Sequence, residues 1–461
     1  MTTATNRTPP LVEVRSHQPA EIAVFLQRRA ADEELPATAW DAGPFPVVAA
    51  HTWGSSCVTS QMGARRLEGG TSGVAESPVT VGPMHPGFDA TVLDDLGRRL
   101  SAVRLAPDRG TAWEQGVPRP WLTSLLADWQ QFDTGAFQAR LDRHAHFRAT
   151  VDGLVIHLVH EPGRGPAPLP LLLTHGWPGS FCEYLDLLPL LTDPGTHGGD
   201  PGDAFTVVAP SLPGFGFSGP PPTGGLTANA VASLWHRLMT EGLGYPRYTA
   251  HGSDLGAGVT ARLARAHRDA VAGIHLATPG LAAPPRPWSP AEEAHFAQMD
   301  AWTGEEGGYA HLHSTKPDTL GAALHDSPAG LAAWIGEKIT AWSSTTAGGQ
   351  PAFPRDLLLG TLTLYWVTGT ISSSLLPYWA YRHTPGPGTA LLPGEQAPVP
   401  TGITIFGGEK VPFPKPPREL AERYFTVTTW AEHDRGGHFP AVAEPQLLAE
   451  TLRDAFRPLR S

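Results

Sequence analysis

From residue 151 to residue 283 the chain alternates short apolar runs with glycine-containing turns and helical stretches. The apolar runs and their turns read PLPLLLTHGWPGS (168–180), FTVVAPSLPGFGFSG (205–219), RYTAHGSDLGAG (247–258) and VAGIHLATPG (271–280). Short apolar strands that alternate with helices indicate a mainly parallel sheet covered by helices on both faces. Such a sheet gathers its functional groups at the carboxyl ends of the strands. The sequence therefore predicts an α/β fold whose chemistry lies in these turns.

The segment before this alternation reads differently. Residues 1–84 hold short apolar pieces among Ala, Gly, Thr and Pro and are predicted to be an N-terminal extension of uncertain fold, with an over-long gene model as the alternative. Residues 85–165 are predicted to form an arm that is helical as far as residue 150. The apolar residues of WLTSLLADWQ (121–130) share one helix face, and AFQARLDRHAHF (136–147) continues the pattern.

The alternation also stops near residue 284 and returns near residue 401. Residues 166–283 and 401–461 are therefore predicted to be the two parts of one sheet core. Residues 284–400, which are rich in Trp and Ala, are predicted to be a helical cap inserted between them, with a helix over DSPAGLAAWIGEKITAW (326–342).

Composition and charge exclude several classes of protein. The formal net charge is −11, and no basic run occurs, so nucleic acid is not predicted as a partner. The two cysteines, Cys57 and Cys182, cannot build a disulfide framework or a structural zinc site. The sequence shows neither 18 consecutive apolar residues nor the pattern of a signal peptide. We therefore expect a cytoplasmic protein without a membrane anchor.

The most informative motif is HGSDLG (251–256), in which a strand runs into a sharp turn and a helix follows. This is the layout of the nucleophile elbow of α/β-hydrolases, which needs small residues two before and two after the nucleophile. Ser253 would have a His and a Leu at these positions, whereas Asp254 has Gly252 and Gly256. Steric space therefore favours Asp254. The alternative is a glycine-rich turn whose Asp only caps the next helix.

A carboxylate nucleophile has chemical consequences. Aspartate, with a reference pKa of about 3.9, is ionised at pH 7 and attacks without a base, forming an ester that must then be hydrolysed. In THGWPGS (174–180), Pro178 lacks an N–H and leaves Trp177 free to present its own. Together with the N–H of Leu255, at the start of the elbow helix, it would form an oxyanion hole. A simple strand-to-helix turn is the alternative.

The third motif is DRGGHFP (434–440), after the last predicted strand. His438 lies in a glycine-flanked loop that can reach the carboxyl edge of the sheet, and neutral imidazole is suited to deprotonating water. Glu409, in IFGGEK, fits the acid that orients it, while Glu432 and Asp434 lie nearer in sequence and fit solvated loop charges. Asp254, Glu409 and His438 follow the nucleophile–acid–histidine order of α/β-hydrolases.

With these motifs the chain resembles the microsomal-type epoxide hydrolases and the related juvenile hormone epoxide hydrolases over roughly residues 85–461. The resemblance is carried by WLTSLLADWQ, HFRATVDGLVIHLVHEPG, HGWPGS, SLPGFGFSG, YAHLHSTKPDTLGAALHDSPAGLAAWI, LYWVTGTISSS, VPTG and RGGHFPA. It implies an α/β-hydrolase core with a helical cap and an N-terminal arm that wraps around both.

The resemblance also implies the remaining site residues. In that family two cap tyrosines hold and protonate the epoxide oxygen, and they match Tyr309 and Tyr378, with Tyr381 close enough to compete for the second role. The chain departs from many relatives at Leu255, where they carry Trp. The implied substrate is a small hydrophobic epoxide, the product is a vicinal diol, and neither a metal nor an organic cofactor is needed. A homo-oligomer is left open.

Two other functions fit parts of the pattern. A haloalkane or haloacid dehalogenase uses the same Asp–His–acid triad but needs donors for the halide, often a Trp where Leu255 stands. A catalytically silent scaffold that binds hydrophobic ligands is the third reading, although every member of the triad is present. A serine esterase would need Ser at position 254. The sequence therefore favours an epoxide hydrolase that works through an aspartyl ester.

Overall fold

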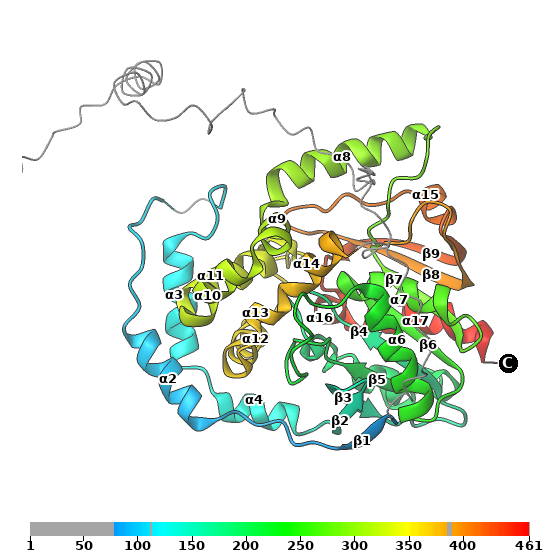
Figure 1. Ribbon diagram of the computed structural model, residues 1–461, viewed down its shortest axis with the longest axis horizontal. Coiled ribbons are helices and arrows are strands. Elements are labelled where there is room, and N and C mark those ends of the chain that lie inside the picture. The colour runs from blue at the N-terminus through cyan, green and yellow to red at the C-terminus, as the bar shows by residue number, and fades with distance from the viewer. Residues whose placement is uncertain (1–77, 111–112, 385–389, 461) are drawn as a thin grey trace, which may run out of the picture. The chain divides into compact units, whose positions relative to one another are not determined.

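The computed structural model describes residues 78–110, 113–384 and 390–460, all within one compact unit, Thr52–Ser461. In this part of the chain nine strands form one sheet in the order β1-β2-β3-β5-β4-β6-β7-β8-β9 (Figure 1). Neighbours from β5 to β9 along that order run parallel, and the pairs β1–β2, β2–β3 and β3–β5 run antiparallel. The predicted α/β fold with a mainly parallel sheet is confirmed. The strands are β1 (Thr80–Pro83), β2 (His146–Val151), β3 (Leu154–Glu161), β4 (Leu169–Thr174), β5 (Phe205–Pro210), β6 (Tyr248–Ser253), β7 (Val271–Ala277), β8 (Ala397–Gly407) and β9 (Phe425–Gly436).

The central strands are buried on both faces. Every residue of β5, β6 and β7 is buried, as expected where helices cover both sides of a parallel sheet. Helices α6 (Ala228–Arg237) and α7 (Leu255–Ala266) pack against each other, and α5 (Leu188–Thr192) packs with α17 (Pro445–Phe456). The short helices α15 (Arg418–Glu422) and α16 (Pro440–Ala443) lie near the chain's end.

The arm differs from its predicted form in one place. Helices α2 (Ala90–Ser101), α3 (Arg119–Gln130) and α4 (Thr134–Leu141) are present, but the helix expected over 136–147 ends at Leu141. Residues 146–151 instead form β2, because this segment pairs with β1 on one side and β3 on the other. The strand β1 lies inside the region assigned to the extension, so that region's last residues are part of the sheet. The predictions for residues 1–77 lie outside the described residues.

Between β7 and β8 the chain is helical, as the sequence predicted. Helix α11 begins after Ser327, whose side chain accepts a hydrogen bond from the Gly330 N–H. No helix of the described residues is long and apolar enough to cross a membrane. The helices of this segment are α8 (Pro290–Glu306), α9 (Gly308–Thr315), α10 (Pro317–Asp326), α11 (Pro328–Trp342), α12 (Arg355–Thr368), α13 (Ile371–Ser374) and α14 (Leu376–His383).

The end of α11 is bonded to the loops that follow β8 and β9. The N–H of Val411 donates to the carbonyl of Ala341 at 2.8 Å, and the N–H of Lys410 donates to that of Ser343 at 3.1 Å. The N–H of His438 donates to the carbonyl of Trp342 at 3.0 Å. One helix end therefore fixes both loops in which the sequence placed candidate triad members.

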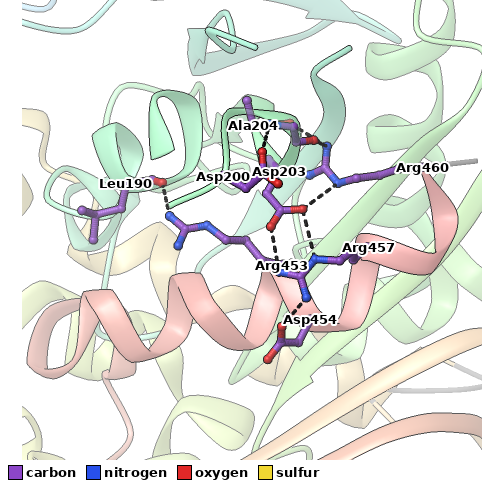
Figure 2. A network of polar contacts seen from close by, with 9 residues as sticks. Leu190, Asp200, Asp203, Ala204, Arg453, Asp454, Arg457 and Arg460 are labelled. Atoms are coloured by element: carbon purple, nitrogen blue, oxygen red, sulfur yellow. Dashed lines mark hydrogen bonds and ion pairs between the residues drawn. The ribbon is translucent and has the colours of Figure 1, made fainter. Parts of the chain in front are cut away.

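A network of arginines joins the C-terminal helix to the core (Figure 2). The buried carboxylate of Asp203 lies 2.7 Å from Nη2 of Arg457 and 3.8 Å from Nε of Arg460. Arg453 donates to the carbonyl of Leu190 at 2.6 Å. Because Arg457 and Arg460 reach this buried carboxylate from positions just after α17, the network anchors α17 on the loop before β5.

We expect Asp203→Ala to lower the free energy of unfolding by about 2–3 kcal/mol, because it leaves two arginines without their buried partner. Asp454→Ala is the matched control: Asp454 also pairs with Arg457 at 2.8 Å but is exposed, so its loss should cost less than about 0.5 kcal/mol. Urea denaturation measures both. Equal effects of the two substitutions would contradict this account.

Two pairs of histidines lie buried in the sheet region. Nδ1 of His146 is 2.9 Å from Nε2 of His157, and Nδ1 of His251 is 3.0 Å from Nδ1 of His275. Each contact needs one donor nitrogen and one acceptor nitrogen, so the two rings of a pair cannot both be imidazolium cations. Burial lowers the pKa of His251 to about 4 and that of His157 and His275 well below the usual value. The folded protein therefore holds these side chains neutral.

These histidines should make the protein sensitive to acid. A histidine whose pKa is lowered by folding protonates first in the unfolded chain, so its contribution is complete above pH about 6.5 and is lost as the pH falls. We expect the free energy of unfolding to fall by about 1 kcal/mol for each such histidine between pH 7 and pH 5.5. Urea denaturation at both pH values checks this. His157→Gln should weaken the dependence and His311→Gln, at an exposed position, should not; equal stability at the two pH values would refute it.

Candidate active site

The turn between β6 and α7 has the geometry that the sequence predicted. Asp254 lies between them with φ +51° and ψ −125°, a backbone conformation that is strained for any residue with a side chain. A Cβ on Gly252 would lie 2.2 Å from the carbonyl oxygen of Gly256, and one on Gly256 would lie 1.9 Å from that of Thr174. Both glycines are therefore needed for the close approach of the turn, α7 and β4.

The two carboxylate oxygens of Asp254 face different partners. Oδ1 accepts a hydrogen bond of 2.8 Å from the N–H of Trp177, in the turn after β4. A Cβ on Gly176 would lie 2.3 Å from the same oxygen, so only glycine allows this approach. Oδ2 lies 3.4 Å from Nε2 of His438. The structure thus brings together three residues that the sequence selected from segments far apart.

Leu255, the second predicted donor of the oxyanion hole, is the first residue of α7. Within the described residues its N–H makes no hydrogen bond to the carboxylate of Asp254. Its place beside the nucleophile candidate agrees with the prediction, and its role as a donor stays a prediction.

Glu409 is buried near His438 but is not hydrogen-bonded to it in the described part of the chain. Burial raises the pKa of Glu409, and the charges of Lys415 and His438 act in the opposite direction. The two alternative acids, Glu432 and Asp434, are exposed on β9, and Glu432 accepts a hydrogen bond from the Trp430 indole. Burial and the charge of His438 therefore favour Glu409 as the orienting acid, which stays a prediction.

Two tyrosines from the helices between β7 and β8 contact Trp177 and each other. The ring of Tyr309, on α9, stacks on that of Trp177 with centroids 5.4 Å apart, and the ring of Tyr378, on α14, lies 6.0 Å from Tyr309. Burial, and next the charges around them, Asp254 among these, raise the pKa of both phenols above the usual value. Both are therefore neutral hydrogen-bond donors at any physiological pH.

Tyr381, the competing tyrosine, follows Tyr378 by three residues on the same helix. Burial and the charge of Asp254 raise its pKa as well, so it also lies close enough to sense the carboxylate. Of these two tyrosines, both within the described residues, it is Tyr378 whose ring contacts the rings of Trp177 and Tyr309. These contacts favour Tyr378 over Tyr381 as the second tyrosine, and its role stays a prediction.

Two residues near the tyrosines were missed by the sequence reasoning. His313 follows Tyr309 by one helical turn and its Nε2 accepts a hydrogen bond of 3.1 Å from the Trp334 indole; burial lowers its pKa to about 3. Lys338, one helical turn after Trp334, places Nζ 5.3 Å from the ring centroid of Tyr309. The spacing of four residues on each predicted helix was the signal that could have found them.

A carboxylate on the sharp turn after a central parallel strand, with an imidazole on the loop after the last strand, defines the chain as an α/β-hydrolase. Among the described residues no group of three or more His, Cys, Asp or Glu side chains could hold a metal ion. Such a site can attack an electrophilic carbon through the carboxylate and then activate water through the imidazole.

Comparisons with known proteins identify the family. Residues 81–184 match the model of the epoxide hydrolase N terminus, and residues 170–307 match that of the alpha/beta hydrolase fold. A protein from Stigmatella aurantiaca is 42% identical over 377 residues, which cover 80% of this chain and 83% of that protein. Epoxide hydrolase 1 of Sus scrofa is 32% identical over 392 residues, covering 78% and 85%. The crystal structure of juvenile hormone epoxide hydrolase from the silkworm Bombyx mori has a TM-score of 0.70 at 29% identity, covering 84% of this chain and 96% of that one. This chain belongs to the epoxide hydrolase family.

The space around the elbow gives a direct test of its geometry. Gly256→Ala adds a methyl group 1.9 Å from the Thr174 carbonyl oxygen and should lower the free energy of unfolding by about 2–3 kcal/mol. Gly97→Ala, in α2, meets no heavy atom within 4 Å and should leave the stability unchanged or raise it by about 0.5–1 kcal/mol. Thermal denaturation compares the two. Equal stability of both variants would show that the turn is looser than described.

Proposed function

We propose that this protein hydrolyses an epoxide to a vicinal diol through an ester formed on Asp254. The observation that carries the proposal is the position of that carboxylate, held between the Trp177 N–H and Nε2 of His438. The buried phenols of Tyr309 and Tyr378 lie beside the same Trp177 ring.

In the first step Oδ2 of Asp254, the oxygen that does not accept the Trp177 hydrogen bond, attacks one carbon of the epoxide ring, and the carbon–oxygen bond of the ring breaks. The departing oxygen needs a proton or strong hydrogen bonds, which neutral phenols supply. Tyr309 and Tyr378 take this role, and one of them gives its proton to the alkoxide. The product of the step is a hydroxyalkyl ester of Asp254.

In the second step His438 takes a proton from water, which attacks the carbonyl carbon of the ester. The tetrahedral oxyanion is stabilised by the Trp177 N–H, which already donates to Oδ1, and by the N–H of Leu255. Glu409 stabilises the imidazolium through its charge. When the intermediate collapses, the departing alkoxide takes the proton of the hydroxyl that the water left on the carbon, which gives the diol and restores the carboxylate. The imidazolium returns its proton to the phenolate.

The aromatic side chains near Asp254 support the proposed substrate class. The rings of Trp177, Trp342, Tyr309 and His438 form successive contacts, with 5.0 Å between the centroids of Trp342 and His438. Aromatic walls favour an apolar substrate, so the proposed substrate is a small hydrophobic epoxide.

The domain boundaries at residues 165, 283 and 400 and a cytoplasmic location are proposed on the sequence alone.

Two substitutions separate the proposed steps. Asp254→Ala should lower diol formation from styrene oxide by more than about a thousandfold, because no nucleophile remains. His438→Gln should slow ester hydrolysis by about a hundredfold or more, so that the protein gains the mass of one substrate molecule. Product chromatography and intact-protein mass spectrometry make the measurements.

Asp434→Asn is the control, since Asp434 is exposed on β9 and should tolerate the loss of its charge. Chloroalkanes serve as the competing substrate. Halide release without diol formation would show that the protein is a dehalogenase rather than an epoxide hydrolase. A His438→Gln variant that stays active and gains no substrate mass would contradict the proposed ester intermediate.

A further inference from the structure

Glu183 is a buried carboxyl group that the proposed mechanism does not use. It lies in the short helix Phe181–Tyr184, which follows the turn that carries Trp177. Its exposed fraction is 7%. Its Oε1 lies 1.4 Å from the place where a Cβ of Gly179 would stand, so the carboxyl is packed directly on the backbone of that turn.

Among the described residues, no positively charged side chain contributes to the electrostatic environment of Glu183. Asp254 is the charged group of the described chain that acts on it, and the Ser180 N–H is its hydrogen-bond donor. Glu183 in turn acts on Cys182 and Tyr184 of its own helix and on Tyr365 of α12. These are neutral groups: burial raises the pKa of Cys182 to about 12 and that of both tyrosines well above the usual value.

Glu292, a second buried glutamate near a helix start, differs from Glu183 in the charge around it. Glu292 also follows a helix-capping serine, Ser289, by three residues and is 1% exposed. Its Oε1 is 2.6 Å from Nε of Arg423, so it is buried as an ion pair. Glu183 has the same spacing from Ser180, but the charge that acts on it is that of a carboxylate, Asp254. Capping therefore explains the sequence pattern of Glu183 but not its surroundings.

A buried carboxyl group becomes harder to ionise when a negative charge acts on it. Burial first, and then the charge of Asp254, raise the pKa of Glu183 to about 8. At pH 7 Glu183 is therefore mainly protonated and neutral.

The turn on which Glu183 packs is the one that serves Asp254. The Trp177 N–H donates to Oδ1 of Asp254 at 2.8 Å, and the Tyr365 hydroxyl donates to the carbonyl of Gly179 at 3.2 Å. A change of charge on Glu183 thus occurs against the backbone that supplies the oxyanion donor.

Resting on the proposed function, we propose that Glu183 is a positioning residue that braces the Trp177–Ser180 turn as a neutral acid, and that its ionisation slows hydrolysis of the Asp254 ester. Hydrolysis develops negative charge on the oxygen that the turn holds, and a second negative charge on the turn opposes it. Ester formation moves negative charge away from the turn towards the substrate oxygen, so the same ionisation should not slow it.

The test resolves the two steps as a function of pH. In wild type, ester hydrolysis should fall about tenfold between pH 7.5 and pH 9, while ester formation changes by less than about threefold. The midpoint of the fall should lie at or below pH about 8, because the ester removes the charge of Asp254 that helps to raise the pKa. Rapid-quench kinetics with styrene oxide, followed by mass spectrometry, measure both steps.

Glu183→Gln retains a neutral group of the same shape, so it should hydrolyse the ester at pH 7 within about threefold of wild type and lose the alkaline fall. Glu292→Gln is the matched control at the other buried capping position and should keep the fall. Infrared spectroscopy tests the resting wild-type protein without a substitution: a protonated-carboxyl band should be present at pH 7 and decrease with a midpoint near pH 8, at or above the midpoint of the kinetic fall.

Three results would overturn the inference: an alkaline fall that persists in Glu183→Gln, a folded Glu183→Gln protein that cannot hydrolyse the ester at pH 7, or the absence of a protonated-carboxyl band. Absence of any ester in the wild type would instead contradict the proposed function.

Discussion

The hydrogen bond from the Trp177 N–H to Oδ1 of Asp254 joins two turns that are 77 residues apart in sequence. It can form because Gly176 and Gly256 have no Cβ. A methyl group at either position would overlap with atoms of the opposite segment, so only glycine lets the turn after β4 and the start of α7 come this close. The strained backbone at Asp254 directs its carboxylate into this contact. The proposed chemistry depends on this contact, because the oxygen that it holds would become the oxyanion.

The end of α11 connects the cap to the same site. Its last residues accept hydrogen bonds from the loop of Glu409 and from the N–H of His438, and the Trp342 ring lies against the imidazole. Trp342 also contacts Tyr309, which stacks on Trp177. The end of α11 therefore contacts both the loops at the sheet edge and the tyrosine of α9. A shift of α11 would move the His438 imidazole and the Tyr309 phenol together.

The sequence predicted those features whose causes are local. The spacing of Gly252 and Gly256 around Asp254 follows from steric space within one turn, and the start of α11 follows from Ser327. The strand β2 was read as helix, because its conformation depends on pairing with β1 and β3 from elsewhere in the chain. Glu183 was not singled out at all. Its spacing from Ser180 equals that of Glu292 from Ser289, and only the folded chain shows that the charge of Asp254 acts on Glu183 whereas Glu292 pairs with Arg423.

The central claim is that carbon bonds transiently to the carboxylate of Asp254, and one turnover in ¹⁸O-labelled water tests it most directly. Water that attacks the ester carbonyl leaves its oxygen in the protein, so the account predicts label in the peptide containing Asp254 and unlabelled diol after a single turnover. Label found in the diol, with none in that peptide, would mean that water attacks the epoxide itself and would contradict the account.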